Sequence, residues 1–499
     1  MLVRSFLNWR WKVLAAGMVF VATSFPVLAQ ETLQDSIQSL QKQTSELKAM
    51  LEEMKAEMVR SHTETMALRQ ELEATREQLA AVVPVPQAGE SPAVQRLEED
   101  QQLLSAKVDD QYQTKVESAS KYRVRLSGTV LMNLFSNNGF VDNIDFPSFV
   151  GQYGTQYSRG SFGGTLRQSQ IGLEAFGPQI KGARVSADVQ FDFAGGFPST
   201  PDGTTLGLPR LRTGAVRLTW PRTTIVAGQD APFFSPRSPT SVATLALPEF
   251  AYSGNLWTWI PQARLERRLD LSESSSVLLQ GGILDPLTGE LPSSQFLRTA
   301  GAGEASRQPA YAARTAWSRK AFGQTLTAGI GGYYSRQAWG PYRNVDAWAG
   351  TADWTVPLSN RWELSGESYR GRAIGGLGGG FGHSVGYSGP VSSLSTQIGG
   401  LNSAGGWAQA KFRQTERLEW NGGFGQDTIL AGDLRRFPVV QQGYIDPTVA
   451  RNQAAFINLI YRPRSDFLFS VEYRHLRTFG ISGNSAGADH INVGMGVLF

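Results

Sequence analysis

The residue type with the clearest chemical potential in this sequence is arginine. From residue 121 to the carboxy terminus, the chain has 31 Arg and 4 Lys against 26 Asp and Glu, a net charge of +9. A guanidinium group stays charged and binds a carboxylate or a phosphate through two parallel hydrogen bonds, whereas an ammonium group acts as a point charge. The preference for Arg over Lys therefore indicates interaction with anionic groups.

The other residues that commonly carry chemistry show no catalytic or metal-binding spacing. The chain has no Cys, so thiolate metal sites, disulfides and cysteine nucleophiles are excluded. Its four histidines, His62, His383, His475 and His490, form no His-Glu-x-x-His motif, and no Gly-x-Ser-x-Gly turn occurs. The glycine-rich stretch 375–382 lacks the Lys-Ser/Thr ending of a phosphate-binding loop. We therefore predict no enzyme activity, no cofactor and no metal site, although folding could still bring a Ser and a His together.

The elements that must position the arginines are β-strands with two different faces. Between residues 184 and 193, Val, Ala and Phe alternate with Arg, Ser, Asp and Gln, and residues 467–474 show a similar pattern. The last nine residues place apolar side chains at 491, 493, 495, 497 and 499, with Asn or Gly between them. Such alternation is typical of strands that face lipid on one side and water on the other. A terminal Phe on such a strand also resembles the closing strand of bacterial outer-membrane barrels, where it is an assembly signal.

The spacing of turns and loops predicts an all-β transmembrane barrel of sixteen antiparallel strands, with eighteen as the alternative. Seven short turns are expected at residues 177–182, 220–222, 270–274, 318–324, 357–361, 414–417 and 461–466. Eight longer loops are expected at residues 137–160, 195–209, 232–262, 286–308, 338–343, 372–404, 431–451 and 479–487. A sixteen-stranded barrel with both termini in the periplasm needs these numbers of turns and loops. The glycines of the sixth loop predict a mobile extracellular surface.

If the apolar residues face lipid, several charged residues face the lumen of this barrel. The expected pore-lining and anion-binding cations are Arg184, Arg217, Arg264, Arg268, Arg314, Arg474 and, in the third loop, Arg237. The expected lumen carboxylates are Asp188, Asp192, Glu266, Glu363, Glu367 and Glu472. Such mixed ladders produce a transverse field across a constriction, and the Arg excess predicts an anion preference. The alternative is that these arginines neutralise wall carboxylates or bind lipopolysaccharide phosphates at the rim.

The third loop, residues 231–262, differs from the other loops in its many aromatic and aliphatic residues. A loop of this composition is expected to fold into the lumen as a constriction, or to contact a neighbouring subunit. Its charged candidates for the constriction are Arg237 and Glu249.

Three segments precede the barrel, which we assign to residues 121–499. Residues 1–29 have the charges, the apolar run and the small residues of a signal peptide cleaved near Ala29. Residues 30–81 form a predicted α-helical coiled coil, because ten of fourteen heptad core positions between 33 and 79 are apolar. Residues 82–120 are a Pro-containing linker and short helix. The net charge of −8 over residues 30–120 suits a periplasmic stalk and argues against a nucleic-acid partner.

Three stretches resemble the DcaP-like trimeric porins of Gram-negative outer membranes. They are Tyr-Arg-Val-Arg-Leu-Ser-Gly at 122–128, Leu-Arg-Gln-Ser-Gln-Ile-Gly-Leu at 166–173, and Val-Ala-Gly-Gln-Asp at 226–230. The family pattern has Arg where this chain has Gln170, which puts the substrate preference in question. The resemblance implies a homotrimer with a periplasmic coiled coil that takes up small anionic solutes such as dicarboxylates.

These observations predict an outer-membrane porin, a passive diffusion channel for small hydrophilic and preferentially anionic solutes. Its expected partners are two further copies of itself, outer-membrane lipid and lipopolysaccharide, the barrel assembly machinery, and the solutes. A function from another class is a structural anchor, in which a barrel plugged by its loops carries a trimeric coiled-coil stalk in the periplasm.

Overall fold

The computed structural model describes residues 115–116, 123–151, 159–197, 207–290, 297–340, 343–391, 393, 395–441 and 448–499. The predicted signal peptide and coiled coil lie outside these residues. So does the linker, except for the two-residue strand β1 (Lys115–Val116), which pairs with the first barrel strand.

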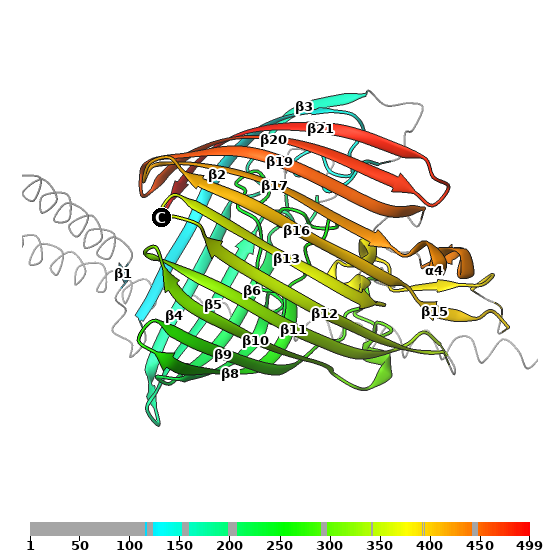
Figure 1. Cartoon of the computed structure of the whole chain (residues 1–499), viewed down its shortest axis with the longest axis horizontal. Coiled ribbons are helices and arrows are strands. Elements are labelled where there is room, and N and C mark those ends of the chain that lie inside the picture. The colour runs from blue at the N-terminus through cyan, green and yellow to red at the C-terminus, as the bar shows by residue number, and fades with distance from the viewer. Residues whose placement is uncertain are drawn as a thin grey trace, which may run out of the picture. The chain divides into compact units, whose positions relative to one another are not determined.

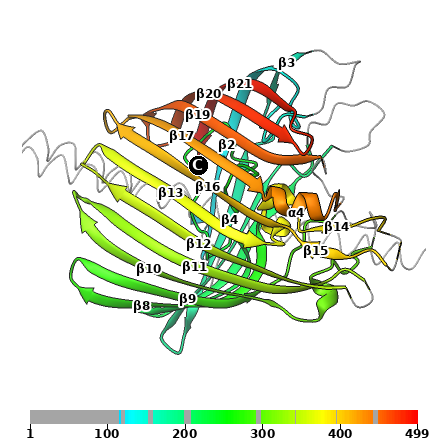
Figure 2. The same cartoon turned by 45° about the vertical axis from the view of Figure 1, so that its right-hand side comes forward.

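The described residues form one closed antiparallel barrel, seen from two directions in Figures 1 and 2. Its sixteen strands are β2 (Arg123–Asn138), β3 (Gly160–Thr165) together with β4 (Gln170–Ile180), β5 (Ala183–Asp192), β6 (Arg210–Thr219), β7 (Thr223–Asp230), β8 (Ile260–Ser272), β9 (Ser275–Leu284), β10 (Ala310–Ala321), β11 (Gln324–Ala338), β12 (Asn344–Pro357), β13 (Trp362–Arg372), β16 (Asn402–Arg413), β17 (Leu418–Ile429), β19 (Val449–Arg464), β20 (Phe467–Gly480) and β21 (Ser485–Leu498). The prediction of sixteen rather than eighteen strands is confirmed.

Strands β3 and β4 act as one barrel strand, because both pair with β2. Thr165 stands opposite Asn133 and Gln170 opposite Thr129, so the second strand has one residue more than β2 over this interval. Such an extra residue is a bulge, which interrupts the ladder and re-aims side chains. Here it buries three consecutive polar residues, Arg167, Gln168 and Ser169.

The barrel closes between β21 and β2. Their ladder runs from Asp489 opposite Asn138 to Leu498 opposite Thr129. Beyond it, the amide of Gly128 donates to the carbonyl of Phe499 at 2.8 Å, and the amide of Phe499 donates to Gly128 at 3.1 Å. A Cβ on Gly128 would lie only 2.6 Å from the Phe499 ring, so a glycine is needed there. The terminal strand therefore closes the barrel, as its alternation predicts.

The two faces of the strands differ in the way that the alternation predicts. On β21, Ile491, Val493 and Met495 are exposed on the outside, whereas Asn492 between them is buried inside. The same contrast holds around the wall, because the exposed large apolar residues of the strands fall on alternate positions. Among the described residues, no helix is both long enough and apolar enough to cross a membrane.

The connections are short at one end of the barrel and long at the other. Seven connections of two to four residues lie at one end of the described strands and eight connections at the other, so the predicted tally of seven and eight is confirmed. Seven of the eight are longer than four residues, and the eighth, residues 481–484, has only four. Short turns face the periplasm in barrels of this kind, and we call the opposite end the loop end. The longer loops contain the helices η1 (Glu304–Ser306), η2 (Gly375–Leu377), η3 (Gly380–Gly382) and α4 (Ala431–Arg436), and a small sheet of β14 (Val385–Tyr387), β15 (Ile398–Gly400) and β18 (Val439–Val440).

The outward face of β21 allows a direct test of the lipid-facing assignment. An Arg at Val493, which stands between Leu134 and Val471, should destabilise the inserted barrel by about 2–4 kcal/mol. An Arg at Val497, near the short-turn end, should cost only about 0–1 kcal/mol. Reversible unfolding in lipid vesicles measures both, and equal costs would contradict the assignment.

Candidate pore constriction

The third loop, residues 231–259 between β7 and β8, folds into the interior of the barrel. Phe233, Phe234, Phe250 and Leu256 are buried there. The ring of Phe234 packs against Tyr333 of β11 at 5.3 Å, and that of Phe250 against Phe456 of β19 at 5.3 Å. The third loop therefore folds into the lumen, as one of the two predictions for it states.

One side of the third loop is held by polar side chains at the bulged second strand. Gln168 donates its Nε2 to the carbonyl of Ala243 at 2.8 Å, and Gln170 donates to Leu245 at 3.3 Å. Arg212 of β6 donates to the same Leu245 carbonyl. The residue that departs from the family pattern, Gln170, thus faces the lumen and touches this loop.

Other parts of the third loop are held by β13 and β16 on the far wall and by β20, which lies two strands from β2. The hydroxyl of Ser235 donates to Glu367 Oε2 of β13 at 2.7 Å. The hydroxyl of Ser241 donates to Glu472 Oε2 of β20 at 2.6 Å. The amide of Thr240 donates to Gln409 Oε1 of β16 at 2.6 Å. The loop therefore spans the lumen between two walls, and Glu367 and Glu472 serve as its acceptors.

Arg474 lies at the centre of a buried charge cluster. Only 2% of Arg474 is exposed, and its Nη2 binds Glu472 Oε1 at 2.6 Å and also contacts Glu249 of the third loop. Its Nη1 donates to the carbonyl of Pro147 at 2.8 Å, which adds the first loop. Burial raises the pKa of Glu249 to about 7, although the Arg474 charge opposes this shift. Arg474 therefore faces inward but joins loops to the wall, away from bulk water.

Arg314 forms a second buried pair. Its Nε and Nη2 bind the two oxygens of Asp353 at 2.8 and 2.7 Å, and its Nη1 donates to Gln280 at 2.9 Å. Arg237 approaches the same Asp353 from the third loop at 3.4 Å and keeps more exposed surface than Arg314. Of these two arginines, Arg237 is the one whose side chain remains accessible to water.

A water-accessible ladder of charge lines β5 to β8. Arg217 binds Asp188 and lies 3.8 Å from Asp230. Arg264 binds Asp230 at 3.0 Å and Glu266 at 2.7 Å. These five side chains alternate in sign around part of the lumen and are half-buried.

The opposite wall carries a second exposed cluster near the short-turn end. Arg413 of β16 binds Glu363 of β13 at 2.9 Å, and Lys411 stands opposite Glu363 in the strand register. The remaining predicted cations lie at the same end, where Arg184 begins the inward face of β5 and Arg268 binds Asp270 at 2.9 Å.

The sequence pattern missed Arg210 and Arg212 of β6. Both bind the fully buried Asp192, with contacts of 2.6 and 3.1 Å, and both stack against the ring of Trp259. The register between β5 and β6 shifts between Gln190 and Phe191, which reverses the alternation relative to Arg217. Strict alternation of faces, starting from the inward Arg217, therefore predicts the wrong face of the strand for these two arginines. The only feature of the sequence that could have indicated their inward position is Asp192, an acid on the neighbouring strand that can pair with both arginines.

The prediction that the sixth loop is mobile surface is wrong. Within residues 373–401, the glycines of η2 and the side chain of Phe381 are buried, and the amide of Trp257 donates to Leu377 at 3.2 Å. A Cβ on Gly376 would lie 2.2 Å from the backbone of Leu287 in the fourth loop. The glycines therefore permit close packing of the third, fourth and sixth loops, and do not provide mobility.

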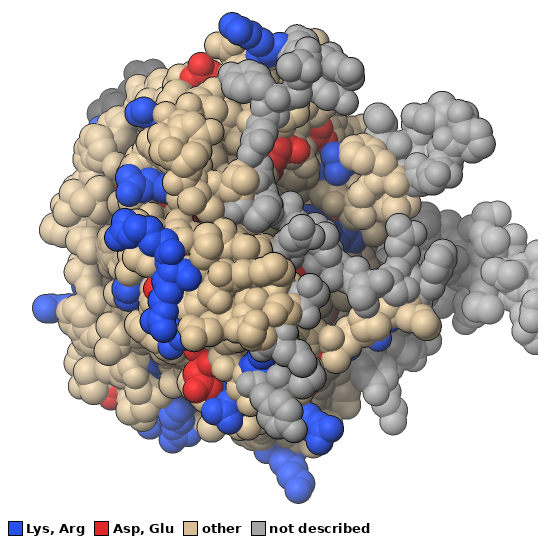
Figure 3. All heavy atoms as spheres, turned by 90° about the vertical axis from the view of Figure 1, so that its right-hand side faces the viewer, with Lys and Arg blue, Asp and Glu red and all other residues tan. Residues whose placement is uncertain are grey.

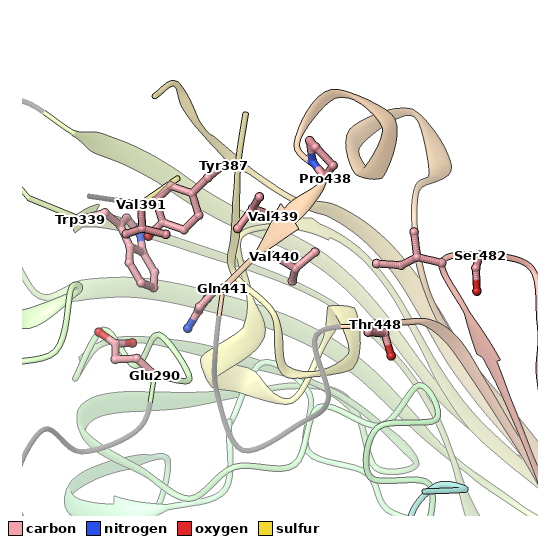
Figure 4. Close-up of a pocket in the computed structure, with 11 residues that line it drawn as sticks. Glu290, Trp339, Tyr387, Val391, Pro438, Val439, Val440, Gln441, Thr448 and Ser482 are labelled. Carbon is pink, nitrogen blue, oxygen red and sulfur yellow. The ribbon is translucent and has the colours of Figure 1, made fainter. Parts of the chain in front are cut away.

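The loop end has a separate cavity of about 890 Å³. It is lined by Trp339, Tyr387, Val440, Gln441 and other residues of the loops, and Figure 4 shows Trp339 and Tyr387 next to one another. Basic side chains gather near one edge of this end in Figure 3. Among the described residues, no group of three or more His, Asp or Glu side chains is placed to hold a metal ion.

The closed sixteen-stranded barrel with an inward-folded third loop has the fold of outer-membrane channel barrels of known structure. The barrel is similar to the outer membrane channel DcaP of Acinetobacter baumannii, with a TM-score of 0.57 and 16% identity over 77% of this chain and 99% of that chain. Weaker similarity links it to an anion-selective porin from Comamonas acidovorans, with a TM-score of 0.44 and 11% identity over 76% of this chain and 100% of that chain. The predicted resemblance to DcaP-like outer-membrane porins is thus confirmed for the fold. No family model and no curated protein sequence matches the chain.

The packing of the sixth loop yields a prediction for Gly376. Gly376→Ala should force the sixth loop away from the fourth and lower the free energy of unfolding by about 1–3 kcal/mol, as overpacking does. Gly432→Ala in α4 is the matched control, since a Cβ there meets no atom within 4 Å. Thermal unfolding in detergent compares the two, and equal midpoints would contradict the packing role.

The buried Glu249 yields a prediction for pH dependence. Its pKa of about 7 in the folded protein exceeds the ordinary 4.5, so the folded state favours the protonated form. Its stabilising contribution is complete below about pH 4.5 and is lost as the pH rises through 7. Glu249→Gln, which stays neutral, should flatten the fall in unfolding temperature between pH 5 and 8. Glu273→Gln, in an exposed turn, should leave that slope unchanged.

Proposed function

We propose that this protein is an outer-membrane porin through which small hydrophilic, preferentially anionic solutes diffuse passively. The observation that carries the proposal is a closed sixteen-stranded barrel whose lumen keeps half-exposed charged ladders beside an inward-folded third loop. This arrangement is that of a selective channel, in which a loop narrows the passage and wall charges act on the solute.

The anion preference rests on two clusters in which cationic side chains outnumber carboxylates. Arg210 and Arg212 share Asp192, and Arg413 and Lys411 face the single Glu363. A dicarboxylate that passes these clusters meets cations whose charge is only partly neutralised by protein carboxylates. Planar guanidinium groups can bind its carboxylates through two parallel hydrogen bonds. The ladder of β5 to β8 opposes this preference, because Asp188, Asp230 and Glu266 there outnumber the cations.

In this proposal each inward group has a defined task. Solute enters through the loops and passes the third loop beside Arg237, whose guanidinium keeps exposed surface. It then moves along Arg217 and Arg264 on one wall and Arg413 on the other. Arg314 and Arg474 do not contact the solute and instead fix the walls and loops that shape its path.

The remaining parts of the proposal concern assembly and placement. A cleaved signal peptide would send the chain out of the cytoplasm, and the coiled coil of residues 30–81 would join three copies in the periplasm. The domain limits 1–29, 30–81, 82–120 and 121–499 belong to the same proposal. Insertion would depend on the barrel assembly machinery reading the strand that ends in Phe499.

One observation favours a structural anchor as the second candidate function. An apolar cluster that includes Phe233, Phe234, Leu256, Ile374 and Leu377 joins the third and sixth loops to the wall inside the barrel. Such packing suits a barrel plugged by its loops. Liposome swelling separates the two functions, because a plugged anchor would leave vesicles tight to small sugars and acids.

Single-channel recording under a potassium chloride gradient tests the porin proposal. We expect conductance steps in triplets and a reversal potential with the sign for chloride, shifted toward cation preference by Arg217→Gln combined with Arg413→Gln. Arg319→Gln, which removes an exposed charge from the outer wall, should leave the reversal potential unchanged. Cation preference of the unmodified protein would overturn the anion preference, and silence from a folded barrel would favour the anchor.

A further inference from the structure

Three arginines near the loop end face away from the lumen. Arg370 of β13, Arg451 of β19 and Arg477 of β20 are exposed and lie on the outward alternate positions of their strands. Most inward arginines bind a carboxylate, whereas these three form no ion pair with any described carboxylate. Part of the Arg excess of the barrel is therefore displayed on its outer wall.

The strand register places these arginines in two adjacent rows. Residues opposite one another in antiparallel strands share a face, and one outward row runs Arg370, Ala404, Thr428, Arg451 and Phe479. With strands about 4.8 Å apart, Arg370 and Arg451 are separated by about 14 Å. Ala404 and Thr428 between them are small, and Arg451 donates its Nε to the Thr428 hydroxyl at 3.5 Å.

The next outward row adds a third cation and two amides. It contains Gln426, Gln453 and Arg477, and Gln453 Nε2 donates to Gln426 at 2.6 Å. Arg451 and Arg477 lie over the ring of Phe479, with distances of 5.6 and 4.9 Å to its centre. The aromatic ring thus holds the two guanidinium groups close to one another in spite of their like charge.

The height of these rows on the wall indicates what they contact. On β20 the outward residues Phe469, Val471 and Tyr473 belong to the lipid-facing band, and His475 follows them directly before Arg477. The arginines follow this band toward the loop end, where hydrocarbon gives way to head groups. Hydrocarbon cannot solvate a guanidinium group, but a phosphate ester at that depth can accept its hydrogen bonds.

We propose that Arg370, Arg451 and Arg477, with Thr428 between them, bind the phosphate groups of a phosphorylated glycolipid in the outer leaflet. The chemistry fits the bis-phosphorylated disaccharide of lipid A, because two phosphates on one rigid head group can engage separated guanidinium groups together. This inference rests on the proposed outer-membrane location and is independent of whether the barrel conducts.

Charge complementarity favours a lipid over a second copy of the chain. The outward carboxylates near this level are already paired, because Asp346 binds Arg336 at 3.0 Å and Asp489 binds His475 at 2.8 Å. Asp433 of α4 forms no ion pair with a described cation but accepts hydrogen bonds from the backbone and side-chain amides of Asn402 at 2.7 and 2.8 Å. These acids of another copy therefore already have partners. A phosphorylated head group supplies the missing negative charge.

Native mass spectrometry of the full-length protein in detergent tests the site. Bis-phosphorylated lipid A should bind the unmodified protein at least tenfold more tightly than the variant Arg451→Gln combined with Arg477→Gln. Lipid A stripped of both phosphates should bind the unmodified protein no better than it binds this variant. Arg319→Gln, an outward arginine at the short-turn end, is the matched control and should keep the full affinity.

Several outcomes would overturn the proposal. These are equal affinity of the double variant, equal binding of dephosphorylated lipid A, or the same loss in Arg319→Gln. Inorganic phosphate that binds as tightly as lipid A would instead assign the row to a free anion. A changed oligomeric state with unchanged lipid A binding would assign it to a contact between copies. Heat-modifiability on gels confirms that each variant is folded, and loss of conductance alone does not bear on these results.

Discussion

The whole structure depends on one constraint, which is that backbone amides and carbonyls in hydrocarbon must pair within the protein. A closed antiparallel ladder meets it, and the pairing of β21 with β2 completes that ladder. Closure fixes which side of every strand is outside, so alternation of apolar and polar residues becomes obligatory. Everything inside the barrel, including the position of the charged ladders, follows from this division of faces.

Buried carboxylates organise the interior of the barrel, either by accepting hydrogen bonds from the third loop or by pairing with an arginine. Glu367 and Glu472 accept hydrogen bonds from hydroxyl groups of the third loop, and Asp353 holds Arg314 in a two-pronged pair. A buried carboxylate is costly unless it is paired or hydrogen-bonded, so these contacts fix the loop in a single position. The buried, fully paired charges thus determine the shape of the passage. The half-exposed pairs determine the electrostatic field inside it.

The sequence was sufficient for the barrel and insufficient for the interior. Alternation and turn spacing predicted the strand count, the turns and the role of the last strand, because these features are local. The roles of Arg314 and Arg474 were not predictable, since burial depends on loops that arrive from elsewhere in the chain. Arg210 and Arg212 were missed because a register shift reverses the alternation. The sixth loop was misjudged because glycine serves close packing and flexibility equally well.

The closing ladder also has a consequence for the order of folding. Asn133 donates to Asn492, a contact between residues 359 positions apart. Contacts this distant in sequence carry the largest loop-closure entropy, and they form late. Until they form, β2 and β21 are both unpaired edges that can pair with other chains. The seam that makes the finished barrel stable in lipid is therefore also where an unfinished chain is most exposed to aggregation.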